Sequence, residues 1–73
     1  MAELGTLALA VEHIDDAQRR IERQRKLVDE LDRDGHDTTE ARSLHETMLK
    51  LLEQMERHRD YLVQSAAKPF RQG

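Results

Sequence analysis

The sequence predicts an all-α fold, an antiparallel hairpin of two coiled-coil-like helices. Three observations support this prediction: a highly charged composition, two matched heptad series of apolar residues, and a helix stop followed at once by a helix start near the middle of the chain. Charged residues make up 37% of the 73 residues, and the chain holds only three Gly and one Pro. This composition is typical of coiled coils and long helices.

The first helix is predicted over residues 6–34. Its apolar residues recur at alternating spacings of three and four, which is the heptad pattern of a helix that packs on a partner helix. The predicted seam of this helix comprises Leu7, Ala10, Ile14, Ala17, Ile21, Gln24, Val28 and Leu31. Gln24, its polar member, has two interpretations: a buried amide that fixes the register, or a packed stem whose amide reaches water.

A turn is predicted over residues 35–37. Gly35 suits the position after a helix C-terminus, where the left-handed conformation favours glycine. Asp37 suits the N-cap of the next helix, and Glu40 follows three residues later in a capping-box-like pair. Because so short a loop joins antiparallel neighbours, we expect the chain to double back here.

The second helix is predicted over residues 38–66, because Pro69 disfavours a helix at its predecessor. Its predicted seam comprises Ala41, Leu44, Met48, Leu51, Met55, His58, Leu62 and Ser65. The expected pairing of the two seams sets Leu31 opposite Ala41 and Ile21 opposite Leu51. Residues 67–73 are predicted to form a loose tail, so that residues 1–73 make a single α-hairpin domain.

A further group of apolar residues is predicted on one side of the hairpin, and we call it the Val11 flank. It comprises Val11, Leu49, Leu52, Val63 and Ala66. A core built from one seam is thin, because ordering each residue costs about 1.5 kcal/mol. We therefore expect the Val11 flank to be covered, either by a second copy in a homodimeric four-helix bundle or by the helix of a partner protein.

A basic stretch within the first helix suggests an alternative function, the binding of nucleic acid. Its outward residues are Arg19, Arg23 and Lys26. Acidic residues interleave with them, no aromatic residue offers a stacking platform, and the chain carries a net charge of −3. These features favour a solvated, salt-paired face over a phosphate-binding one.

No pattern of catalytic or metal-ligating residues is found. The four histidines, His13, His36, His45 and His58, include no pair four residues apart and no Glu-x-x-His motif. The chain has no Cys and no Gly-rich phosphate loop, so we predict a non-enzymatic protein without a cofactor. His58, placed in the seam, predicts a loss of stability when its imidazole is protonated.

The localisation expected from the sequence is cytoplasmic. The N-terminal apolar stretch lacks the basic residues of a signal peptide. No apolar run approaches the roughly 18 residues that a membrane span needs, so no membrane association is expected.

The chain resembles a group of short bacterial proteins with a three-part pattern. This pattern reads R-I-x-R-Q-x-x-L-V, here residues 20–28, then G-H-D-T at 35–38 and H-R-x-x-L at 58–62. The resemblance spans residues 13–62 and implies the helical-hairpin fold, with no functional residues to carry over. The predicted architecture also resembles the Rop-type RNA-binding hairpin dimer, at the level of the fold alone.

Overall fold

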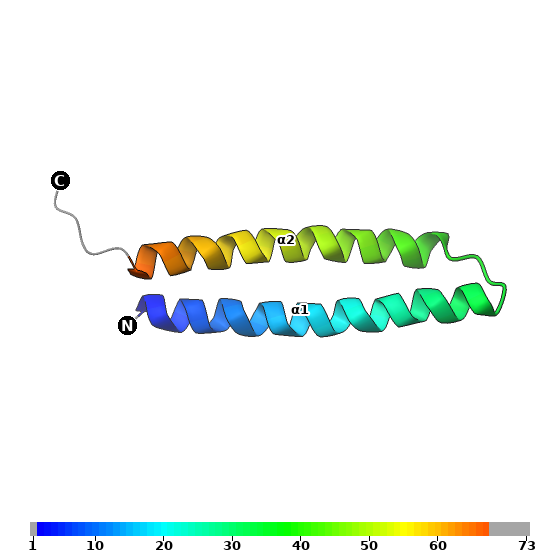
Figure 1. Ribbon diagram of the computed structural model, residues 1–73, viewed down its shortest axis with the longest axis horizontal. Helices are drawn as coiled ribbons and strands as arrows, with labels where there is room; N and C mark the ends of the chain where they lie inside the picture. The colour runs from blue at the N-terminus through cyan, green and yellow to red at the C-terminus, as the bar shows by residue number, and fades with distance from the viewer. Residues whose placement is uncertain (1, 68–73) are drawn as a thin grey trace.

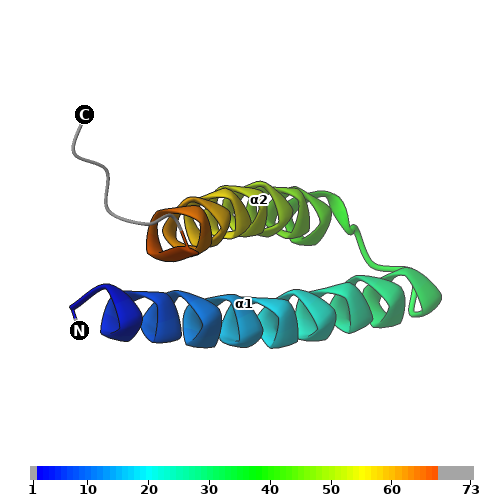
Figure 2. The same ribbon diagram turned by 60° about the vertical axis from the view of Figure 1, so that its left-hand side comes forward.

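The computed structural model describes residues 2–67 of the chain and consists there of two long α-helices joined by a short connection (Figure 1). Helix α1 spans Ala2–Arg33 and helix α2 spans Thr39–Ala67. The helices run antiparallel (Figure 2). The predicted all-α hairpin is thus confirmed, while the predicted tail beyond Ala67 lies outside the described residues.

The helix bounds differ slightly from the predicted ones. Helix α1 begins at Ala2 rather than at Thr6, because Gly5 is accommodated within the helix. Backbone N–H groups of the connection donate hydrogen bonds to carbonyls in the last turn of α1 and end this helix. The connection itself covers residues 34–38, which is longer than the predicted turn of 35–37.

Helix α1 ends in a Schellman motif at Gly35. This glycine has a φ of 79°, in the left-handed region. The His36 N–H donates to the Leu31 carbonyl at 2.9 Å and the Gly35 N–H donates to the Asp32 carbonyl at 3.1 Å. These two bonds are the 6→1 and 5→2 pairs that define the motif. The role predicted for Gly35 is therefore the one it has.

Helix α2 begins at a cap formed by two residues. The Thr38 carbonyl accepts the first helical bond from the Arg42 N–H at 2.8 Å, which makes Thr38 the N-cap and places Asp37 one residue outside the helix. The Asp37 carboxylate still accepts from the Thr39 N–H at 3.0 Å and from the Thr39 hydroxyl at 2.7 Å. Within residues 2–67, Glu40 forms no reciprocal capping bond with Asp37, so the predicted box is only half formed.

In helix α1, the seam lies where the sequence places it. Ile14 and Val28 are buried, with exposed fractions of 4% and 7%. Every other member of the predicted seam is half-buried. The heptad pattern of this helix therefore identified the face that packs on α2.

In helix α2, the structure differs from the predicted seam at every second position. Ala41, Met48, Met55 and Leu62 are half-buried as expected. The predicted members between them are exposed, namely Leu44, Leu51, His58 and Ser65. Their places are taken by the residues that follow the first three, namely His45, Leu52 and Arg59. Helix α2 is thus rotated about its axis relative to the prediction.

The two helices are also displaced along each other relative to the predicted pairing. The Gln24 side-chain amide donates to the Ala41 carbonyl at 3.0 Å. The predicted pairing sets Ala41 opposite Leu31, which lies seven residues or about 10 Å from Gln24 at 1.5 Å per residue. A glutamine side chain does not span that distance. The longer connection accounts for the displacement, since the last turn of α1 extends beyond the first turn of α2 (Figure 1).

Candidate interaction surface

A groove runs along one flank of the hairpin, between the exposed edges of α1 and α2. It consists of two adjoining hollows of about 300 and 320 Å³ that share His13, Leu51 and Met55. Asp16, Arg20 and Met48 line the first hollow, and three more residues, Gln54, His58 and Ala10, line the second. We call this surface the Leu51 groove. It is open along its length and offers no enclosed cavity.

Leucine side chains dominate this flank. Leu51 lies in both hollows and is 52% exposed. Leu44 precedes Leu51 by two helical turns and therefore lies on the same side of α2. Leu27 follows Arg20 by two turns on α1, so that it continues the same flank toward the connection. Both are exposed. The rotation of α2 has moved two leucines from the predicted seam to this surface.

The predicted Val11 flank is reduced by the same rotation. Leu52 is half-buried in the seam and no longer belongs to this flank. Val11, Leu49 and Val63 are exposed, at 44–48%, and Ala66 is exposed as well. Leu49 lies about 200° around α2 from Leu51, on the opposite flank. The hairpin thus carries two apolar flanks, and the Leu51 groove is hollowed at its centre.

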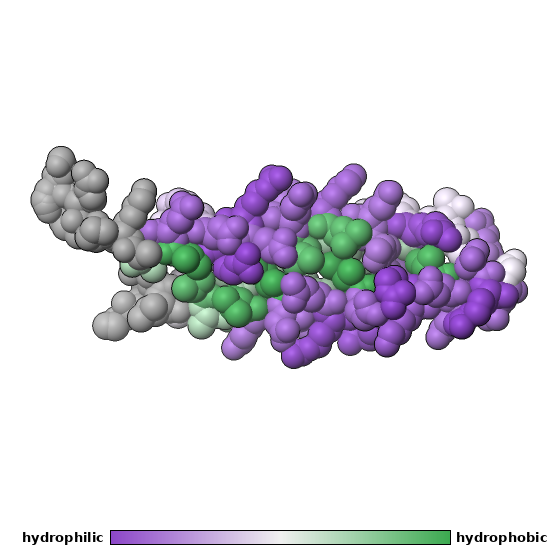
Figure 3. Space-filling model, viewed as in Figure 1, coloured by the Kyte–Doolittle hydropathy of each residue, from purple (hydrophilic) through white to green (hydrophobic). Residues whose placement is uncertain are grey.

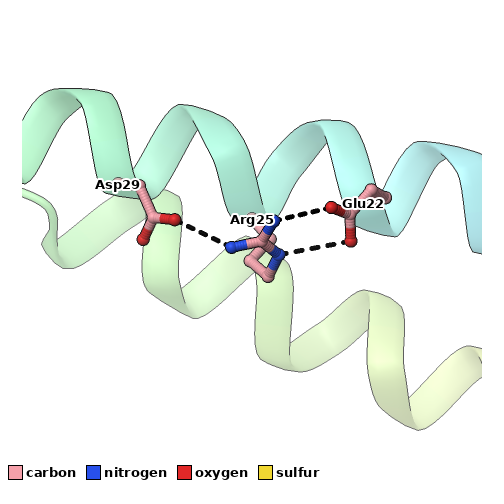
Figure 4. A network of polar contacts seen from close by, with 3 residues as sticks. All are labelled: Glu22, Arg25 and Asp29. Atoms are coloured by element: carbon pink, nitrogen blue, oxygen red, sulfur yellow. Dashed lines mark hydrogen bonds and ion pairs between the residues drawn. The ribbon is translucent and has the colours of Figure 1, made fainter.

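Charged side chains border both flanks, as the space-filling view shows for one face (Figure 3). On α1 an ion-pair network joins Glu22, Arg25 and Asp29, with distances of 2.6 Å from Arg25 to Glu22 and 2.8 Å to Asp29 (Figure 4). The hydrogen bond from Arg25 lowers the pKa of the Glu22 carboxyl, and the same bond raises the pKa of Arg25. These exposed pairs favour the helix only weakly, because solvent screens the attraction between their charges.

The predicted nucleic-acid face is partly neutralised by neighbouring acids. Arg19 pairs with Asp15 at 2.6 Å, one turn earlier on α1. Arg23 and Lys26 are exposed on the same helix. Because carboxylates occupy positions between these cations, the face presents alternating charge rather than a continuous basic stripe.

The histidines occupy different environments from those expected. His58 is exposed in the Leu51 groove, whereas His45 is half-buried in the seam. The expectation of a seam histidine thus applies to His45 instead of His58. The charge of His45 also reaches Glu22 across the seam, where it contributes to the lowered pKa of that carboxyl. Among the described residues, no three His, Asp or Glu side chains are grouped so that they could hold a metal ion.

The residues that line the groove were not recognised as a site in the sequence. Leu44 and Leu51 carry the spacing of seam residues, and nothing in the spacing of His13 and Arg20 marks them as groove residues. The available signal was the presence of two overlapping apolar stripes on α2, one through Leu51 and one through Leu52. Heptad spacing fits both stripes, so it could not select between them.

Two further findings bear on the class of protein. Within residues 2–67, neither helix is long and apolar enough to cross a membrane. Comparisons with protein-family models, with curated proteins and with solved structures found no match for this chain.

Proposed function

We propose that this chain is a non-enzymatic protein-interaction module that self-associates through the Leu51 groove. Two hairpins would pack groove to groove and form a four-helix bundle. The observation that carries the proposal is the exposure of Leu51 at the centre of an elongated hollow between two helices. A helix flank of a second hairpin is the kind of surface that fits such a groove.

The thin core of the hairpin supports this proposal. Among the described residues, only Ile14 and Val28 are buried apolar side chains. The radius of gyration is 17.2 Å, whereas a compact chain of this length has a radius of about 11 Å. Chains of this size rarely stabilise themselves with one core, and association is one of the usual remedies. A groove-to-groove contact would supply the missing apolar burial.

A second copy is favoured as the occupant because the groove is self-complementary. Asp16 and Arg20 line the α1 side of the groove one turn apart and carry opposite charges. They form an ion pair, with 3.1 Å between the Arg20 Nε and the Asp16 Oδ2. A two-fold axis across the groove would set the acidic position of one copy against the basic position of the other, around apolar centres formed by Leu51. Such an isologous contact uses the same residues twice and closes on itself.

The test compares two leucine variants on opposite flanks of α2. Leu51→Glu places a charge in the groove, and Leu49→Glu places the same charge two residues away, at a similarly exposed position. Because the substitution is the same in both, effects on helix propensity and net charge are matched. The molar mass of each variant is measured by light scattering at several concentrations, with helix content followed by circular dichroism.

We expect the unaltered chain and Leu49→Glu to form dimers, and Leu51→Glu to remain monomeric at the same concentrations. Dissociation by Leu49→Glu alone would assign self-association to the Val11 flank and overturn the proposed interface. A chain that is monomeric and helical at every concentration would overturn self-association itself.

A further inference from the structure

Two histidines from different helices lie in the same half of the Leu51 groove. His13 on α1 and His58 on α2 both line its second hollow, together with Leu51 and Met55. The remaining lining residues are Ala10 and Gln54. Within the part of the chain that the structure describes, no carboxylate lines this hollow. A positive charge on either imidazole would therefore meet apolar and neutral surroundings here.

Two acids close to these histidines along the helices are paired with arginines. On α1, Asp16 in the adjoining hollow lies 3.1 Å from Arg20. On α2, Asp60 lies 3.0 Å from Arg59. Tyr61, one turn after His58, is exposed. The hollow itself thus presents neutral groups to the two imidazoles. Glu12 and Glu56, which are also close to the histidines in the sequence, do not line it.

We propose that self-association through the Leu51 groove is linked to protonation of His13 and His58, so that the dimer forms with neutral imidazoles and dissociates as they become charged. This inference rests on the proposed function. Closing the groove removes water from both rings, and desolvation disfavours the charged form of histidine. Association therefore lowers the pKa of these groups, and proton uptake in turn favours the separated chains.

The direction of the pH dependence follows from that linkage. The ordinary pKa of a histidine imidazole is about 6.5. Above that value the imidazoles are neutral in both states, so association is at full strength. As the pH falls below it, the separated chains bind protons more readily than the dimer. Each imidazole whose pKa is one unit lower in the dimer weakens association by up to about tenfold.

The experiment measures the dissociation constant of the unaltered chain by sedimentation equilibrium between about pH 8 and about pH 5.5, a range that spans the ordinary histidine pKa. Ionic strength is held constant. The same series is run on the double variant His13→Gln, His58→Gln and on the control His36→Gln. The control removes an exposed imidazole in the connection, outside the groove. His45 is retained throughout, so its titration in the seam is common to all three proteins.

We expect association to weaken about tenfold at the lower pH in the unaltered chain and in His36→Gln, whereas the dissociation constant of the double variant, whatever its value at the higher pH, should change little with pH. A dimer whose dissociation constant is independent of pH would overturn the proton linkage and leave the groove interface standing. An equal pH dependence in the double variant would also overturn it. A chain that is monomeric even at the higher pH would instead show that the proposed function fails.

Discussion

The Gln24 side-chain amide donates a hydrogen bond to the Ala41 carbonyl across the seam, at 3.0 Å. The two residues are 17 positions apart and belong to different helices. A part-buried polar group in a helix seam favours the one register in which it finds a partner, because its desolvation is compensated only there. This bond therefore fixes how far α2 is displaced along α1.

Substitution Gln24→Ala should lower the free energy of unfolding by about 1–2 kcal/mol. The change removes one part-buried hydrogen bond, worth about 0.5–1.5 kcal/mol net, together with the packing of the glutamine stem. Urea denaturation at a fixed chain concentration measures the effect. Gln18→Ala is the matched control, because Gln18 is exposed on the same helix and its loss should change stability by less than about 0.5 kcal/mol. Equal effects at both positions would contradict a role for the cross-seam bond.

The sequence predicted α1 better than α2 for a physical reason. In α1 the residues beside the seam are mostly charged, so that only one face of the helix could be buried. In α2 the alternatives at two of the disputed positions are close in character: Leu51 and Leu52 are both apolar, and His58 and Arg59 are both polar. Local spacing cannot decide between them. The choice depends on how long the connection is and on where the Gln24 amide finds an acceptor, and both are tertiary properties.

Substitution of a glycine by alanine should change the stability of the hairpin in opposite directions at Gly35 and at Gly5. Gly35 has a φ of 79° and empty space around the position of a Cβ atom. Gly35→Ala should therefore destabilise the hairpin by about 1 kcal/mol through backbone strain alone. Gly5 lies within α1 and also has no atom within 4 Å of an added Cβ. Gly5→Ala should stabilise the helix by up to about 1 kcal/mol. Thermal melts followed by circular dichroism compare the two, and a stabilising Gly35→Ala would contradict the left-handed turn.

The orientation of α1 can be tested by removing a single methyl group from its buried face. Ile14 is the least exposed apolar residue described, at 4%. Ile14→Val should lower the free energy of unfolding by about 0.5–1.5 kcal/mol, from lost burial and a small cavity. Val11→Ala, on the exposed flank of the same helix, should change it by less than about 0.5 kcal/mol. The comparison is made by urea denaturation, and the reverse order would contradict the observed orientation of α1.

The candidate site could not be predicted for the same reason as the seam of α2: the sequence allows two neighbouring stripes of this helix to be buried. A one-position change in the buried stripe of α2 moved Leu44 and Leu51 outward and Leu52 inward. The sequence correctly indicated that the hairpin carries more apolar surface than one seam can bury. It placed most of that surface on the Val11 flank, because a flank is assigned only after the seam is known. The groove depends on the orientation of α2, which the sequence alone does not determine.

The cap of α2 predicts a specific contribution to acid unfolding. Hydrogen bonds from the Thr39 hydroxyl and the Thr39 N–H hold the pKa of Asp37 below its ordinary value. The folded chain thus binds this proton less readily than the unfolded chain. The contribution of Asp37 to stability is complete above the ordinary Asp pKa of about 3.9 and is lost as the pH falls through the lowered pKa of the folded state.

We therefore expect the melting temperature of Asp37→Asn to lie below that of the unaltered chain near pH 7, and the two to converge toward about pH 3. Asn retains an acceptor oxygen for the Thr39 N–H but carries no titrating charge. Thr39→Ala removes the hydroxyl donor and leaves the backbone donor in place, so its difference from the unaltered chain should also shrink at low pH, by a smaller amount. Melting curves of all three proteins across this range measure the effect. A difference between Asp37→Asn and the unaltered chain that stayed constant with pH would show that the carboxylate charge is not what the cap uses.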